Sequence, residues 1–116
     1  MRSIILSEVN EILKAGHSLS EIGVNNWALP YDKALNALPQ FEKWGIPVLG
    51  GDVCESIDGI FQYTCDNWYC DQEDTESNSD FVIRSVEKAK TFILNFKTEY
   101  ADRTSFALVL DTSLIH

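Results

Sequence analysis

A helical pattern near the C-terminal end constrains the fold of this 116-residue chain more than any other sequence feature. Ser77-Asn78-Ser79-Asp80 offers both a capping serine and an acid for a helix N-terminus. The apolar side chains that follow recur every three or four residues over about five turns: Val82, Val86, Ala89, Ile93, Phe96 and Tyr100. We therefore predict one long helix that begins near Ser77 and extends to Tyr100.

The middle of the chain has the character of β-structure. Ile46 to Cys54 is largely apolar and contains the pair Gly50-Gly51, where a bulge or turn would lie. Ser56 to Gly59 is a turn signal, and Ile60 to Thr64 follows as the returning strand of a hairpin. Asn67 to Asp71 predicts a third strand.

Two further helices are predicted in the N-terminal part. Ile5, Val9, Ile12 and Leu13 have helical spacing and indicate a helix from about Ser3 to Ala15. Asp32 to Trp44 predicts a second helix. We expect Asp32 to cap this helix and Pro39 to kink or restart it, and we assign Trp27 and Trp44 to the core.

The last apolar run, Ser105 to Leu110, predicts a buried strand. The predicted element order is therefore α-α-β-β-β-α-β. Strands grouped between helical segments favour an α+β fold with a small antiparallel sheet packed against helices. The length and composition fit one domain spanning residues 1–116.

The charge is concentrated in one segment. The net charge is −9, and no Lys or Arg lies between Lys43 and Arg84. Nucleic-acid binding requires a basic surface to replace phosphate counterions, so this composition argues against it. An acidic surface instead accelerates encounter with a basic protein, although it can also serve only solubility. The segment holds nine acids: Asp52, Glu55, Asp58, Asp66, Asp71, Glu73, Asp74, Glu76 and Asp80.

No catalytic or metal-binding motif is recognisable. The two histidines, His17 and His116, stand without a partnered motif, so we predict no catalytic residues and no enzymatic activity. Cys65 and Cys70 lack the second ligand pair of a structural zinc site and are better explained as small apolar residues. In the acidic run from Asp71, a calcium loop would need Gly and Glu where other residues stand. We predict no metal and no cofactor.

The compartment is predicted from what the chain lacks. No apolar run approaches the ~18 residues of a membrane span, and Glu8 and Glu11 interrupt the N-terminal segment where a secretory signal stays uncharged. Cys54, Cys65 and Cys70 are an odd number without the spacing of a disulfide framework. We therefore expect a cytoplasmic protein without a membrane partner.

Three stretches together carry a family resemblance: Gly-Val-Asn-Asn-Trp-Ala-Leu at 23–29, Ile-Pro-Val-Leu-Gly-Gly-Asp-Val at 46–53, and Asn67-Trp68-Tyr69 before the long helix. They resemble the immunity protein 40 family of bacterial polymorphic toxin systems, whose pattern has an aromatic residue where Cys54 stands. The resemblance implies a cytoplasmic antitoxin. Such a protein binds the toxin domain encoded beside it in a stoichiometric complex and has no catalytic residues.

The acidic segment agrees with this resemblance, because a nuclease toxin has a basic surface that an acidic inhibitor can cover. Asp52 could equally accept backbone hydrogen bonds in its Gly-Gly turn, and Trp68 is either an interface anchor or a core aromatic. The predicted partner-binding residues are Asp52, Glu55, Asp58, Trp68, Asp71, Glu73, Asp74, Glu76 and Asp80.

Two other functions remain open at this point. The first is an acidic adaptor or regulatory module without a toxin partner. The second is a small enzyme that uses a cleft carboxylate such as Asp52, which would show a concave pocket with perturbed carboxyl groups. A homo-oligomer is compatible with the sequence but is not indicated by it.

Overall fold

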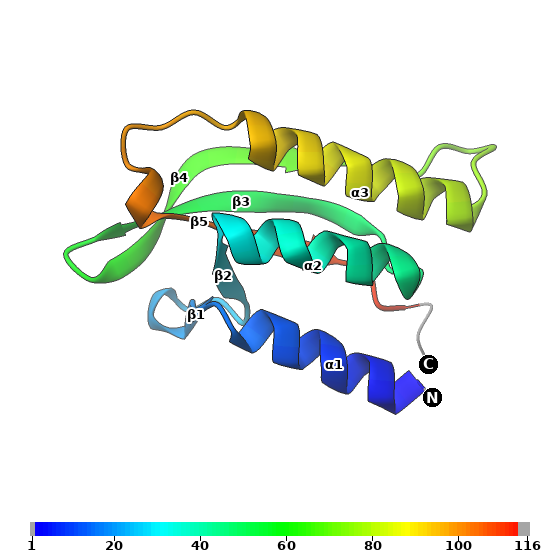
Figure 1. The fold of residues 1–116 in the computed structure, drawn as a ribbon, viewed down its shortest axis with the longest axis horizontal. Helices are drawn as coiled ribbons and strands as arrows, with labels where there is room; N and C mark the ends of the chain where they lie inside the picture. The colour runs from blue at the N-terminus through cyan, green and yellow to red at the C-terminus, as the bar shows by residue number, and fades with distance from the viewer. Residues whose placement is uncertain (1, 114–116) are drawn as a thin grey trace.

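The last strand of the chain lies at the centre of a five-stranded antiparallel sheet, whose strand order is β1-β2-β5-β3-β4. A computed structural model describes residues 2–113 (Figure 1). The α+β prediction is confirmed. The elements are α1 Arg2–Lys14, β1 His17–Ser18, η1 Ser20–Ile22, β2 Trp27–Pro30, α2 Tyr31–Lys43, β3 Val48–Ile57, β4 Ile60–Tyr69, α3 Asn78–Asn95, η2 Ala101–Arg103 and β5 Thr104–Leu110.

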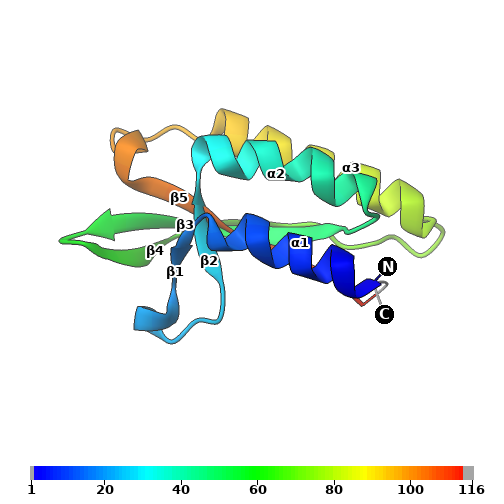
Figure 2. The same cartoon turned by 60° about the horizontal axis from the view of Figure 1, so that its bottom comes forward.

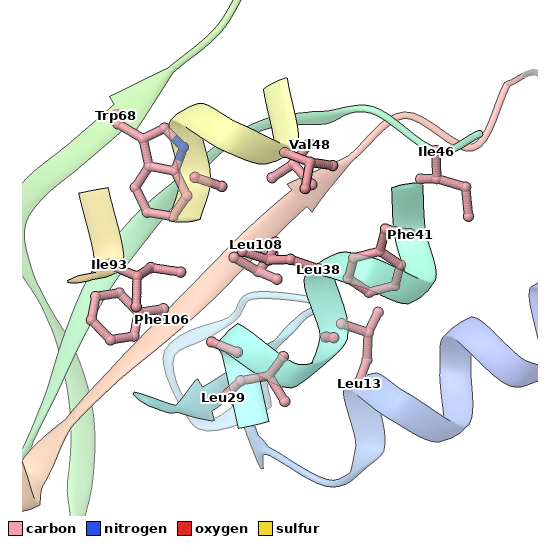
Figure 3. Packing of buried hydrophobic residues seen from close by; sticks show 14 of the residues in the cluster. Leu13, Leu29, Leu38, Phe41, Ile46, Val48, Trp68, Ile93, Phe106 and Leu108 are labelled. Atoms are coloured by element: carbon pink, nitrogen blue, oxygen red, sulfur yellow. The ribbon is translucent and has the colours of Figure 1, made fainter. Parts of the chain in front are cut away.

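Helices α2 and α3 lie side by side over one face of the sheet, as both views show (Figures 1 and 2). Alternation along each strand sends every second side chain toward these helices. The main core forms there, around Leu29, Phe41, Val53, Ile93 and Phe106 (Figure 3). α1 contacts β2 and adds Val9 and Leu13 to the same cluster.

The opposite face of the sheet carries a smaller apolar cluster. Leu19 from the segment between β1 and β2 packs on Ala28, Cys54 and Ala107, which belong to three neighbouring strands. The half-buried Phe61 of β4 also packs against this cluster. Residues 19–24 therefore cover only part of this face.

The connection between the first two helices was not predicted as β-structure. It contains β1 and β2, and β2 pairs with the central strand β5 through Ala28–Ala107 and Leu29–Phe106. A strand of four residues ending in Pro30 has too few positions to show a period of two. Its conformation is set by burial against β5, because Ala28 and Leu29 are fully buried.

The predicted third strand, Asn67 to Asp71, is wrong as a separate element. Ile60 to Tyr69 is a single strand that pairs with β3 on both sides of a bulge. Asp52 pairs with Asn67 and Cys54 pairs with Tyr63, so three residues of β4 lie opposite Val53 alone. This bulge places the polar residues Thr64 and Asp66 inside one strand, which is why the sequence pattern breaks there.

The helix boundaries needed smaller corrections. The Ser77 side chain accepts a hydrogen bond from the Asp80 amide at 3.1 Å, which confirms the predicted cap of α3. The helix ends at Asn95, because Phe96 turns into an extended conformation and its ring meets Phe106 edge to face. The prediction that this helix reaches Tyr100 is therefore wrong.

The second helix also differs in detail from the prediction. Its N-cap residue is Pro30 and no side chain caps it, so Asp32 lies in the first turn and does not cap the helix. α2 continues through Pro39 as one helix with Pro39 exposed, so the predicted restart is wrong. Trp27 and Trp44 are half-buried and pack against the main core cluster, at its margin.

The glycine pair and the downstream Asn-Trp-Tyr meet across the sheet. Gly51 pairs with Trp68, and a Cβ on Gly51 would lie only 2.2 Å from the indole ring. A Cβ on Gly50 would lie 2.3 Å from the Trp68 carbonyl oxygen. The absence of a side chain at Gly51 lets the Trp68 ring lie over β3, where it stacks on Phe92 with ring centroids 4.6 Å apart, and its absence at Gly50 lets the two backbones approach.

Replacing Gly51 with alanine is expected to lower the free energy of unfolding by about 1–3 kcal/mol, because a methyl group and the indole cannot occupy the same space. Urea denaturation measures the loss. Trp68→Leu is the matched partner, because a smaller side chain frees that space, and the two substitutions should couple by about 0.5–3 kcal/mol. Additive losses would contradict the contact.

Candidate partner-binding surface

The predicted partner-binding residues occupy four separate places in the fold. Asp52 lies on the partly covered sheet face, and Trp68 lies in the core. Glu55 and Asp58 belong to the end of the β3–β4 hairpin. The remaining residues lie in the segment from the end of β4 to the first turn of α3, at the other end of the molecule (Figure 1): Asp71, Glu73, Asp74, Glu76 and Asp80.

At the end of the β3–β4 hairpin, one of the two predicted acids is already neutralised by an ion pair. Glu55 forms an ion pair with Arg103 of η2 at 3.5 Å. Asp58 lies in the tight turn with a positive φ of 52°, followed by Gly59 with a φ of 82°. Aspartate tolerates this left-handed conformation better than most residues, so Asp58 has a structural reason to be there.

Of the two interpretations of Trp68, the structure places the indole in the core. The residue is 7% exposed and lies with the buried cluster that Figure 3 shows. Its ring stacks on Phe92. The indole Nε1 is buried and has no hydrogen-bond partner within the described part of the chain. A contact between Trp68 and a partner remains an untested prediction, and it would require the ring to become accessible.

Arg84 holds the acidic segment between β4 and α3 in place. Its guanidinium donates to both carboxylate oxygens of Glu76 at 2.7 Å and to the Asp71 carbonyl oxygen at 2.6 Å. It also lies 3.3 Å from the Cys70 Sγ. A bidentate arginine–carboxylate pair fixes geometry as well as charge, so one side chain joins both ends of this acidic loop (residues 71–76) to α3.

This clamp divides the acids of the loop into two kinds. Glu76 is paired with Arg84, whose hydrogen bonds lower the pKa of the Glu76 carboxyl to about 2. Asp71, Glu73 and Asp74 are exposed and make no ion pair with the described residues. Sequence reasoning did not include Arg84 in the site, although it is the first basic residue after the acidic segment.

The sheet face opposite α2 and α3 is called here the open face. Strand register places Ala107 of β5, Asp52 of β3 and Asn67 of β4 in one row across it. The adjacent row is Ser105, Cys54 and Tyr63. Asp52 is half-buried, whereas Asn67 and Tyr63 on the edge strand are exposed.

Asp52 influences its neighbours on this face. Burial and then the charge of Asp52 raise the pKa of the Cys54 thiol to about 11, so the thiol stays protonated at neutral pH. Burial and the same carboxylate also raise the pKa of Tyr63. The predicted alternative, in which Asp52 accepts hydrogen bonds in a Gly-Gly turn, is not observed, since its side chain makes no hydrogen bond with any described residue.

The bulge in β4 lies directly beside Asp52. Cys65, at its centre, has a φ of 76°, which is unfavourable for a residue with a Cβ. Thr64 donates to the Asp66 carboxylate at 2.9 Å and accepts from the Asp66 amide at 3.2 Å, which holds the bulge in shape. Bulges with strained residues are over-represented next to functional sites.

The described histidine and the metal-ligating side chains of residues 2–113 do not come together in a cluster. His17 stacks on Phe61 with ring centroids 4.3 Å apart and contacts no carboxylate, while His116 lies outside the described residues. No three metal-ligating side chains come together in that part of the chain. No helix there is long and apolar enough to cross a membrane.

The sequence that forms this fold is similar to a known protein family. A family model described as immunity protein 40 matches residues 18–110, which is most of the chain. The match includes every strand of the sheet except the first residue of β1, together with α2 and α3. No curated protein and no solved structure matches the chain.

The Glu76–Arg84 pair predicts a pH-dependent contribution to stability. Because the folded pKa of about 2 is below the ordinary value of 4.5, the pair stabilises fully above about pH 4.5 and is lost as pH falls toward 2. Glu76→Gln should therefore be less stable than the parent at pH 6 and equally stable near pH 2. Urea denaturation across this range measures the difference, and a difference independent of pH would contradict the pairing.

Proposed function

We propose that this chain, which belongs to the immunity protein 40 family, works as one domain of residues 1–116 that neutralises a cognate polymorphic toxin by stoichiometric binding. Family membership is the observation that carries this proposal. We place the protein in the cytoplasm, where a toxin would otherwise act on the producing cell.

The charge distribution supports a toxin with a basic surface, such as a nuclease. The segment between Lys43 and Arg84 has no basic residue, so all charged side chains of β3, β4 and the acidic loop are carboxylates. Surfaces of opposite charge accelerate encounter and exclude partners of like charge. A nuclease must hold phosphate, so its active surface has the charge that this segment attracts.

The acidic loop is well suited to meet such a partner. Arg84 holds its two ends, while Asp71, Glu73 and Asp74 remain exposed. A loop that is ordered before binding loses less conformational entropy in the complex. We include Glu55, Asp58, Glu76 and Asp80 in the wider acidic surface, where they contribute charge at longer range.

Co-expression is the direct test of the function. The toxin domain encoded next to this gene should arrest cell growth when produced alone and should not do so when this protein is produced with it. The two chains should then copurify in a one-to-one complex. Growth arrest that persists together with no complex would contradict the immunity function and would favour an acidic adaptor.

Charge reversal tests the acidic loop. Asp71→Lys, Glu73→Lys and Asp74→Lys together should slow association with the toxin by one to two orders of magnitude at low salt, and high salt should reduce the effect. Glu76 is left unchanged because its loss would release Arg84. The control replaces three exposed acids on α1 and α2 with lysine, namely Glu8, Glu11 and Glu42. If both triple variants slow association equally, the loop acts only through the net charge of the protein and is not a specific contact site.

A further inference from the structure

Asp52 is an unusual residue at its position in the fold. It lies on β3, which has a neighbouring strand on each side, and aspartate is disfavoured inside sheets. Two ion pairs occur within residues 2–113, Glu76–Arg84 and Glu55–Arg103, and neither includes Asp52. A half-buried carboxylate is normally paired with a cation. Asp52 has no such partner among residues 2–113, although its position favours one.

The neighbours of Asp52 on the open face are small or exposed. In its row, Ala107 has only a methyl group and Asn67 is exposed. The segment that covers the open face packs against Ala28, Ala107, Cys54 and Phe61, so it covers the β5 side of this row and the hairpin side of Asp52. On the other side of Asp52 the next row is Val109, Gly50 and Tyr69, in which both side chains are exposed. A side chain from another molecule can therefore approach Asp52 between Tyr63 and Tyr69.

Three basic side chains that contact β3, β4 or the acidic loop already have partners there. Arg103 is paired with Glu55 and lies over the Tyr100 ring at 4.2 Å, and Arg84 is paired with Glu76. Lys88 reaches the edge of β4, where its Nζ donates to the Tyr69 carbonyl oxygen and lies 5.3 Å from the Tyr69 ring centroid. β3 and β4 contain no basic residue of their own.

We propose that the open face is the centre of the toxin interface and that Asp52 receives a basic side chain of the toxin there. This inference rests on the proposed function and deepens it by naming the contact. The incoming arginine or lysine would pair with the Asp52 carboxylate, beside the Tyr63 ring and the Asn67 side chain. Charge-assisted hydrogen bonds are stronger in such a partly desolvated position than on the exposed acidic loop.

The toxin is better accommodated on the open face than by adding a strand to the unpaired edge of β4. Addition of a partner strand needs a regular row of unpaired backbone groups. The bulge at residues 64–66 interrupts that row in the middle of β4, and Asp66 adds a charge to the bulge. The same bulge sets Tyr63 and Asn67 on either side of residues 64–66, opposite the two β3 residues that flank Val53.

The test compares Asp52→Asn with Asp32→Asn in the complex with the toxin domain encoded beside this gene. Both remove one carboxylate and keep the shape of the side chain, and Asp32 is exposed in the first turn of α2, on the other face of the sheet. Asp52→Asn should weaken binding about 30-fold or more, mainly through faster dissociation, whereas Asp32→Asn should change it less than about threefold. Titration calorimetry and stopped-flow kinetics measure both values.

A second variant tests the same contact without removing the carboxylate. Asn67→Arg places a cation opposite Asp52 in the strand register, where an ion pair across the strands would occupy the carboxylate within the chain. This variant should fold at least as stably as the parent in urea denaturation and should lose toxin binding about as strongly as Asp52→Asn.

The possible outcomes separate the two proposals. If the parent protein binds the toxin and both Asp52→Asn and Asn67→Arg bind it equally well, the inference about the open face is overturned and the immunity function stands. If the parent protein forms no complex and gives no protection, both proposals are overturned. Weakening by Asp52→Asn and Asn67→Arg, with Asp32→Asn near the parent value, supports the inference.

Discussion

The contact between Gly51 and the Trp68 indole organises the rest of this structure. It favours one register of β3 on β4, brings the Trp68 indole onto Phe92 of α3, and so joins the edge strand to the helical layer. A sheet position without a side chain is ordinarily weak, and an aromatic ring from the neighbouring strand restores the missing packing. The acidic loop leaves β4 directly after this contact, so its starting point depends on it.

The sequence predicted those parts of the fold in which many residues repeat one signal. α3 was found with its cap because four apolar positions inside the helix, Val82, Val86, Ala89 and Ile93, agree with Ser77. The β3–β4 hairpin was found because a turn signal separates two apolar runs. The parts that it missed depend on single long-range contacts: β2 is a strand because β5 lies beside it, and the insertion in β4 is visible only in the pairing with β3.

The candidate site shows the same division. Composition located the acidic segment but could not tell its members apart, because the state of a carboxylate depends on what faces it. Arg84 lies eight residues after Glu76 in the sequence and pairs with its carboxylate. The carboxylates of Asp71, Glu73 and Asp74 make no ion pair with the described residues. The row that joins Asp52 to Asn67 could not be predicted either, because the insertion shifts the register between them.

The acidic loop and Asp52 on the open face contribute to binding in different ways. Exposed loop carboxylates act over about a Debye length and mainly change how fast a partner arrives, since water and salt screen them in the complex. Asp52 is half-buried between strands, where a docked partner would exclude water and strengthen the pairing. Because Asp52 lacks a cation within residues 2–113, its desolvation in a complex would be favourable only if the partner supplies one. The loop therefore favours rapid encounter with basic proteins in general, whereas the open face discriminates among them by requiring a cation at one position.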